Sequence, residues 1–113
     1  MMSVNYTVKI TSQAYENLRE ITKYISHNLH APDAAVTLLD KIYKKAEALA
    51  YMPERIALIE EEPWRSEGIR KISVDNFYMY FWVDKSNMLV QIIAVIYSRR
   101  DQMHQLADIM HLK

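Results

Sequence analysis

Two adjacent arginines and a histidine lie close together near the end of the chain, in a pattern suited to handling a phosphate. The stretch VIYSRRDQMHQL, residues 95–106, carries Arg99, Arg100 and His104 directly after an apolar run. The planar fork of an arginine can hold two phosphate oxygens at once. An imidazole, with an unperturbed pKa of about 6.5, can give or take a proton near neutral pH. These residue types suit metal-free cleavage of RNA.

Such cleavage needs several groups that face one phosphate. The 2′-hydroxyl attacks, so the site requires a base, an acid for the leaving 5′-oxygen, and cations that offset charge on the phosphorane. Arg70 is a further candidate cation of the catalytic set, and Tyr97 is a second candidate for proton transfer. Lys71, Tyr78 and Tyr80 are candidates for substrate binding, because they can hold a phosphate or stack on a base.

Each candidate also has a structural interpretation. Arg70 can pair with an acidic neighbour on an open sheet face, and His104 can be an ordinary surface residue. Arg99 and Arg100 can be solvated residues at a helix start, although cations there oppose the helix dipole. Asp101 is expected to cap that helix or to pair with Arg100. The tyrosines can simply pack on the sheet with their hydroxyls in water.

Length and composition narrow the function classes. The 113 residues, half of them hydrophobic and a quarter charged, predict one globular domain over residues 1–113. A formal net charge of zero counts against binding nucleic acid through bulk positive charge. The lack of cysteine excludes disulfides, a thiol nucleophile and thiolate metal sites. The single glycine, Gly68, excludes glycine-rich phosphate loops, so we expect no cofactor.

The remaining composition signals concern metals and location. His27 and His30 have no carboxylate at ligand spacing, so we expect no metal site. The chain begins without a basic region followed by a long apolar core. No apolar run approaches the roughly 20 residues that a membrane span needs. We therefore expect a cytoplasmic protein with no membrane partner.

The first half of the chain predicts a strand and two helices. Residues 4–10 alternate between apolar and polar positions, which is typical of a half-buried strand. Thr11 or Ser12 can cap a helix that follows, and Pro32 suits the first turn of a second helix, which Pro53 ends. Apolar residues recur at helical spacing in both helices. A short break joins them, so they are expected to pack as an antiparallel hairpin.

The second half changes to a period of two. Residues 69–74, 77–83 and 88–97 are expected strands joined by tight turns, and 55–59 is a candidate short strand. The stretch 88–97 is almost wholly apolar, as expected of a central strand covered on both faces. A final helix is expected at 100–111.

This order predicts an α+β fold. It comprises an N-terminal strand, an antiparallel helical hairpin, a three- to four-stranded antiparallel meander and a C-terminal helix. The N-terminal strand must join the later sheet, and the hairpin must cover one face of it. Trp64, in the acidic loop before the meander, is expected to be either a hydrophobic anchor or a partner contact.

At this level the chain resembles the toxins of bacterial type II toxin–antitoxin pairs that include RelE and ParE. The resemblance rests on YTVKIT and on A…L…I..YI in the first helix, and on AA..LL..I and L..MP in the second. It continues through EGIRKISVDNFYMYFWVD and ends with VIYSRRD. It implies a RelE/ParE-like fold and a growth inhibitor that an antitoxin neutralises by wrapping around it as an extended or helical segment.

The resemblance leaves two targets open. RelE-like toxins enter the ribosomal A site and cut mRNA, whereas ParE-like toxins act on DNA gyrase and are not known as nucleases. Arg70, Arg99 or Arg100, and His104 lie near the positions that contribute to cutting in RelE-like toxins. Tyr78 departs from the pattern, because an arginine is expected there. Tyr97 stands where ParE-like sequences often have histidine.

The first hypothesis is therefore a ribosome-dependent, metal-independent mRNA endoribonuclease (an mRNA interferase). The alternative is a ParE-like gyrase inhibitor without catalytic activity, and a third possibility is a protein that has lost toxicity and only binds an antitoxin. Because so many tyrosines and methionines on a small sheet cannot all be buried, an exposed groove should suit an amphipathic helix or an added strand. We expect the cognate antitoxin to cover the basic positions with acidic side chains.

Overall fold

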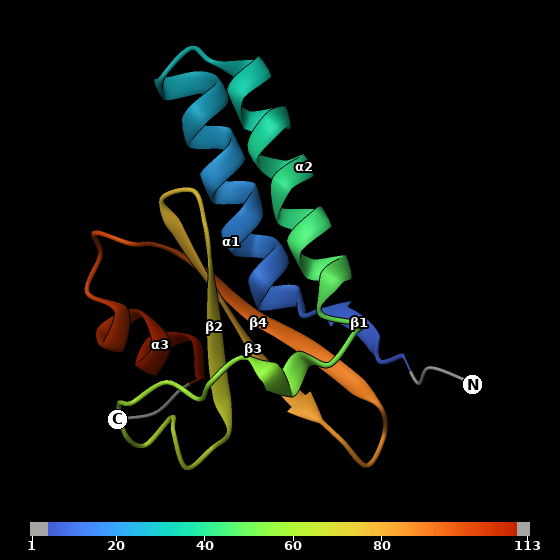
Figure 1. Ribbon diagram of the computed structural model, residues 1–113. Coiled ribbons are helices and arrows are strands. Elements are labelled where there is room, and N and C mark those ends of the chain that lie inside the picture. The colour runs from blue at the N-terminus through green and yellow to red at the C-terminus, as the bar shows by residue number, and fades with distance from the viewer. Residues whose placement is uncertain (1–4, 111–113) are drawn as a thin grey trace.

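A computed structural model describes residues 5–110 of the chain. A helical hairpin stands over a twisted sheet, and a short third helix lies beside the sheet (Figure 1). The helical hairpin and the C-terminal helix are present as predicted, and the antiparallel meander has three strands. The elements in chain order are β1 (Thr7–Ile10), α1 (Ser12–Lys23) continued by a π-helix (Tyr24–Asn28), α2 (Pro32–Ala48), a 3₁₀-helix (Pro53–Arg55), β2 (Ile69–Val74), β3 (Phe77–Asp84), β4 (Leu89–Tyr97) and α3 (Gln102–Met110).

The sheet is mixed, with the strand order β1-β4-β3-β2. Strands β2, β3 and β4 form the predicted antiparallel meander. Strand β1 joins its edge parallel to β4, from Thr7 opposite Leu89 to Ile10 opposite Ile92. The candidate strand at 55–59 contributes only an isolated bridge between Leu58 and Arg70, so the meander does not gain a fourth strand there.

Each face of the sheet has its own apolar core, which confirms that β4 is covered on both sides. On the face under the hairpin, Met79 and Phe81 of β3 pack with residues of α1 and α2. On the opposite face, Tyr80 of β3 packs with Trp64 and with Leu106 of α3. The alternation along β3 therefore separates the two faces as the sequence predicts. Trp64 is a buried anchor of the second core.

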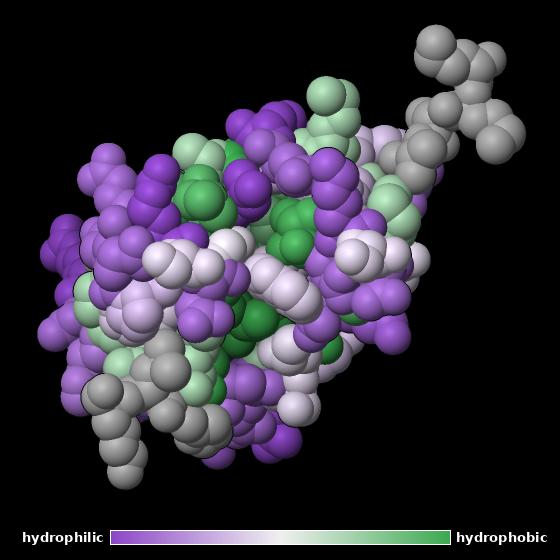
Figure 2. All heavy atoms as spheres, turned by 90° about the horizontal axis from the view of Figure 1, so that it is seen from below, coloured by the Kyte–Doolittle hydropathy of each residue, from purple (hydrophilic) through white to green (hydrophobic). Residues whose placement is uncertain are grey.

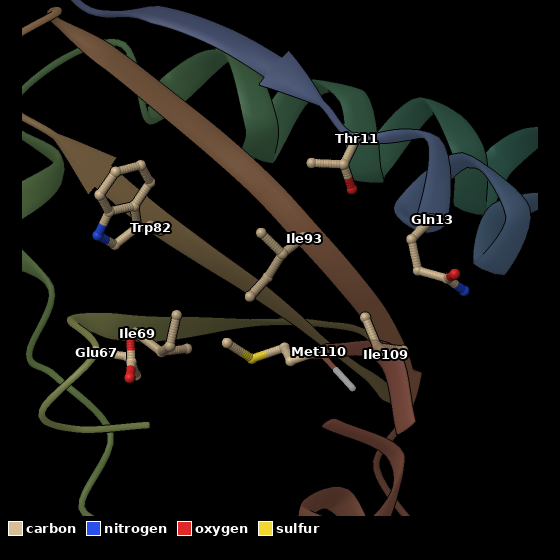
Figure 3. Close-up of a pocket in the computed structure, with 8 residues that line it drawn as sticks. All are labelled: Thr11, Gln13, Glu67, Ile69, Trp82, Ile93, Ile109 and Met110. Atoms are coloured by element: carbon tan, nitrogen blue, oxygen red, sulfur yellow. The ribbon is translucent and has the colours of Figure 1, made fainter. Parts of the chain in front are cut away.

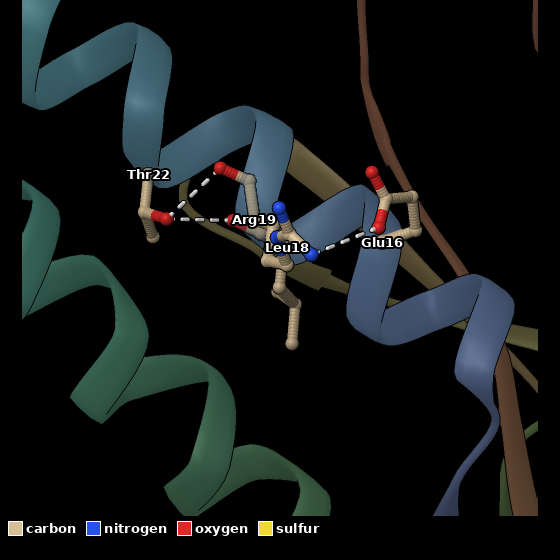
Figure 4. A network of polar contacts seen from close by, with 4 residues as sticks. All are labelled: Glu16, Leu18, Arg19 and Thr22. Atoms are coloured by element: carbon tan, nitrogen blue, oxygen red, sulfur yellow. Dashed lines mark hydrogen bonds and ion pairs between the residues drawn. The ribbon is translucent and has the colours of Figure 1, made fainter.

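Both helices of the hairpin end differently from what the sequence predicts. Thr11 caps α1 by accepting a hydrogen bond from the Ala14 amide, as predicted. The helix then widens into the π-helix, and just before it the Thr22 hydroxyl donates to the carbonyls of Leu18 and Arg19 (Figure 4). Such side-chain bonds compete with the helix ladder and bend helices. The hairpin's second helix ends at Ala48, before the proline at which we expected it to end.

The last helix begins later than expected. Gln102 is its first residue, and Asp101 caps it by accepting from the His104 amide at 3.1 Å, as predicted. Arg99 and Arg100 therefore belong to the connection after β4 rather than to the first turn of the helix. The expected ends at residues 4 and 111 lie outside the described residues. Within residues 5–110 no helix combines the length and apolar character needed to cross a bilayer.

Candidate functional site

Arg70 is bound to the backbone of the segment that follows α2. It lies opposite Phe81 on β2, and cross-strand partners share a face, so its side chain is on the hairpin side of the sheet. Its Nη1 donates to the carbonyls of Glu54, at 3.4 Å, and Ile56. Its buried Nε has no hydrogen-bond partner among the described residues. This arginine therefore fastens the 3₁₀ segment to the edge of the sheet.

The three predicted substrate-binding residues lie on the other face, toward α3. Lys71 lies opposite Tyr80 in the strand register. The Lys71 ammonium sits 4.3 Å from the ring centroid of Tyr78, in a cation–π contact. Both side chains are partly exposed, so this pair is open to a ligand.

Tyr80 is completely buried and does not reach solvent. Its hydroxyl donates to Oε1 of Gln102 at 3.0 Å. Burial raises the pKa of Tyr80 well above that of a free phenol, and the negative charge of Glu61 raises it further. The hydroxyl therefore stays protonated at physiological pH and acts as a fixed hydrogen-bond donor.

Gln102 is a positioning residue that the sequence did not reveal. Its Nε2 donates to the carbonyls of Tyr97, at 2.7 Å, and Arg100, at 2.8 Å. Together with its bond from Tyr80, this amide ties the sheet core to the connection that carries Arg99 and Arg100. The only sequence signal was a polar residue at the start of an expected helix, which is too common to stand out.

Arg99 and Arg100 are exposed and form no ion pair with any described residue. Tyr97, at the end of β4, packs its ring on Phe77 with centroids 5.5 Å apart and is partly exposed. His104 is on the exposed side of α3, where its Nε2 lies 3.5 Å from Oδ2 of Asp108.

The predicted site residues thus divide into three places. Arg70 is on the hairpin side of the sheet, whereas Lys71, Tyr78 and Tyr80 are on the α3 side. The remaining four, Tyr97, Arg99, Arg100 and His104, follow one another from the end of β4 into α3. No group of three or more potential metal ligands occurs among the residues that the structure describes.

Two hollows flank this C-terminal region. One, of about 340 Å³, lies between the sheet and the end of α3 (Figure 3). Its lining combines the apolar residues Ile69, Trp82, Ile93, Ile109 and Met110 with the polar residues Thr11, Gln13 and Glu67. Figure 2 shows the molecule from the end opposite the tip of the helical hairpin. On this face, apolar surface is visible in gaps between polar residues. The other, of about 620 Å³, lies between α1 and the end of β4 and has Arg100 at its rim. We call it the β4 groove.

Comparison with known families gives a match over almost the whole chain. Residues 8–102 match the model of the ParE toxin of the type II toxin–antitoxin system parDE. The chain belongs to this toxin family. Comparison with curated proteins found no match.

Solved structures share the fold of this ParE-family toxin. The chromosomal ParDE system from P. aeruginosa gives a TM-score of 0.68 at 21% identity, covering 84% of this chain and 98% of that one. The RelBE2 toxin–antitoxin complex from Mycobacterium tuberculosis gives 0.60 at 18% identity, covering 85% and 94%. A double mutant of the E. coli toxin RelE in the free state gives 0.61 at 15% identity, covering 89% and 92%. The RelE/ParE-like fold prediction is confirmed.

Proposed function

We propose that this toxin, as a single domain of residues 1–113, stops growth in the cytoplasm by binding DNA gyrase and performs no chemistry of its own. The observation that carries the proposal is the separation of the predicted catalytic groups. Arg70 is engaged with backbone carbonyls on one side of the sheet. Of the other candidates, Lys71, Tyr78 and Tyr80 lie on the opposite side. Tyr97 is the last residue of β4, and Arg99, Arg100 and His104 follow it in the chain.

The separation of these candidate groups argues against RNA cleavage, because that chemistry needs them close together. Base, acid and cations must all reach one phosphate, so the side chains that carry them have to converge on one small volume. Burial of Tyr80 removes a further group from the solvent-accessible surface. A binding protein has no such requirement, because exposed cations such as Arg99 and Arg100 contribute wherever the target offers an acidic surface.

The same proposal includes a cognate antitoxin. Two of the similar solved structures are described as a ParDE toxin–antitoxin system and a RelBE2 toxin–antitoxin complex. The two exposed arginines, which form no ion pair with a described residue, would attract acidic antitoxin side chains, and their coverage would block the surface used for the target. Neutralisation and blocking of the target surface then coincide.

A second candidate function is ribosome-dependent cleavage of mRNA, and one observation favours it. Lys71 and Tyr78 form a partly exposed cation–aromatic pair on the α3 side of the sheet, where a base could stack and a phosphate could bind. His104 and Tyr97 would then transfer protons, with Arg99 and Arg100 as phosphate ligands. Arg70 would take no part in that version of the site.

The test is expression of the chain in cells that lack an antitoxin. We expect growth arrest with stalled DNA breaks and an SOS response, while mRNA stays intact. Cleavage of mRNA at codon positions within minutes would support the second candidate and overturn the first. Normal growth with abundant folded protein would indicate a chain that only binds an antitoxin.

Variants separate the two functions further. A nuclease that uses His104 should lose orders of magnitude in activity in His104→Ala, because acid–base groups typically contribute about 10²–10⁴-fold. A gyrase-binding toxin should keep its potency within a few-fold, since this side chain is mostly exposed and its imidazole lies beside the equally exposed Asp108 carboxylate. Asp108→Ala is the matched control, because it removes the same side-chain contact and leaves the imidazole.

A further inference from the structure

The end of β4 has an open edge. Strand β1 covers β4 only from Leu89 to Ile92 because the chain turns into α1 directly after Ile10. Strand β4 continues to Tyr97 and keeps its pairing with β3 on the other side. On the β1 side, the last part of β4 therefore has no neighbouring strand among the described residues. The β4 groove, between this part of β4 and α1, lies there instead.

The backbone direction at this edge follows from the ladder. The Ser98 amide donates to the Asn76 carbonyl at 2.8 Å, so Phe77 and Tyr97 form a pair without mutual backbone bonds. In an antiparallel ladder such pairs alternate with bonded ones, and their N–H and C=O groups point away from the partner strand. The same holds two residues earlier for Val95, so both residues direct their backbone groups toward the open edge.

Val95 and Tyr97 together direct four backbone groups, two N–H and two C=O, toward the open edge. Two of these groups already have hydrogen-bond partners. The Val95 amide donates to Oδ1 of Asn17 at 3.1 Å, and the Tyr97 carbonyl accepts from Arg100 and Gln102. The Tyr97 N–H and the Val95 C=O have no partner among residues 5–110. A strand parallel to β4, as β1 is, places one residue opposite Ile96 that bonds to both groups.

The groove beside this edge is suited to the side chains of such a strand. Ile21 and Ile25 of the first helix and Phe77 of β3 form its apolar lining. Tyr24 and Leu29, which also line it, are each 55% exposed. Apolar side chains this exposed around one groove indicate a binding surface rather than scattered surface residues.

The charges at the rim define the chemistry of the partner. Arg100 lies at the rim close to the end of β4, and Glu20 of α1 is also part of the lining. Neither forms an ion pair with any described residue. An acidic side chain placed near Arg100 would therefore find a cation that is not already engaged.

We propose that an extended segment of the antitoxin adds to the sheet as a strand parallel to β4, opposite Ile96. Its backbone amide donates to the Val95 carbonyl, and its carbonyl accepts from the Tyr97 amide. Its apolar side chains fill the β4 groove, and an acidic residue of the segment pairs with Arg100. This inference rests on the antitoxin that is part of the proposed function.

The test is amide hydrogen exchange of the toxin, alone and bound to its cognate antitoxin, taken as the product of a neighbouring reading frame that binds the toxin. The Tyr97 amide should exchange at least about tenfold more slowly in the complex, because a new backbone hydrogen bond protects it. The amides of Val8 and Ile10, which the register directs to the outer edge of β1, should not change. Protection of β1 with no change at Tyr97 would overturn the inference.

Two variants and two matched controls measure the side-chain part by affinity. Tyr24→Glu and Arg100→Glu should each weaken binding by about 30-fold, the loss typical of an interface hot spot. Tyr15→Glu and Arg19→Glu introduce the same changes on exposed parts of α1 outside the β4 groove and should have little effect. Equal losses in all four variants, or in none, would contradict the assigned groove.

The outcomes separate this inference from the proposed function. If the neighbouring protein binds while Tyr97 remains unprotected, only the strand addition is wrong. If it does not bind at all, the antitoxin part of the proposed function fails and the inference fails with it. If Tyr97 is protected in the toxin alone at high concentration and the mass doubles, the occupant is a second copy of this chain, which also overturns the inference.

Discussion

Arg70 and the Arg99–Arg100 pair are chemically alike, but they have different environments. Arg70 lies within a strand, and its guanidinium donates to the carbonyls of Glu54 and Ile56. Arg99 and Arg100 lie in an exposed connection without ion pairs to described residues. The first cation holds the fold together, and the other two are available to a partner. The type of a residue therefore indicates which chemistry is possible. The hydrogen bonds that its side chain already makes decide whether that side chain is available to a partner.

The largest expected effect is a loss of partner binding when the two exposed arginines are replaced. The double substitution Arg99→Ala and Arg100→Ala should weaken binding to the antitoxin and to gyrase by about 30-fold or more, because hot-spot arginines each contribute roughly 2 kcal/mol. The free energy of unfolding should change by less than about 0.5 kcal/mol, as is usual for surface positions. Calorimetric titration and chemical denaturation measure the two quantities. A large loss of stability would make these arginines structural, like Arg70.

The next effect is on stability and concerns Arg70. Arg70→Met keeps the apolar stem and removes the guanidinium, leaving the Glu54 and Ile56 carbonyls without that donor. We expect the free energy of unfolding to fall by about 1–3 kcal/mol. Lys71→Met is the matched control on the same strand, and its cation–π contact is worth less than about 1 kcal/mol. Urea denaturation measures both losses. Equal losses of unfolding free energy in the two variants would show that Arg70 and Lys71 contribute equally to stability.

A smaller effect concerns the hydrogen bond between Tyr80 and Gln102, which positions the connection between β4 and α3. Tyr80→Phe deletes the hydroxyl that donates to Gln102 and should cost about 1 kcal/mol in unfolding free energy. Because the folded protein raises the pKa of Tyr80 above 10.0, the stabilising contribution is present below that pH and is lost as the pH rises further. The stability difference between wild type and variant should therefore narrow in alkaline denaturation series. A difference that widens there would contradict the buried, protonated phenol.

The smallest effect is expected at an exposed contact that involves none of the three arginines. The amide and hydroxyl of Ser66 both donate to Glu62 at 2.9 Å and lower the pKa of that carboxyl below 4.5. Its contribution is present above pH 4.5 and disappears as the pH falls through the lowered pKa. An NMR titration should place the Glu62 pKa below 4.5, and Ser66→Ala should move it upward. An unchanged pKa in the variant would exclude the serine hydroxyl as a cause and leave the Ser66 amide, which the variant retains.

Much of the fold follows from patterns that are local. Helical spacing and the capping Thr11 predicted α1, and the alternation along Phe77–Asp84 predicted which residues face each core. The parallel pairing of β1 depends on where the whole hairpin places that strand, which no local pattern contains. The π-helix at Tyr24–Asn28 likewise replaces what periodicity alone describes as one continuous helix.

The candidate site was less predictable because hydrogen-bond partners far along the chain decide it. Arg70 alternates with Ile72 and Val74, and this pattern could have placed it on the hairpin side. Its partners at Glu54 and Ile56 belong to a segment without regular periodicity, so the sequence could not show that the guanidinium was engaged. The exposure of Arg99 and Arg100 agrees with the prediction because their connection has no apolar pattern that would bury it.

The most direct test of the central claim is a supercoiling assay with purified gyrase and purified toxin, run beside a translating ribosome reaction that reports mRNA length. We predict that the toxin inhibits supercoiling in proportion to its occupancy of gyrase and leaves mRNA full length. The double substitution Arg99→Ala and Arg100→Ala should abolish inhibition at the same toxin concentration. Unaffected supercoiling together with mRNA cut on the ribosome would contradict gyrase binding as the function.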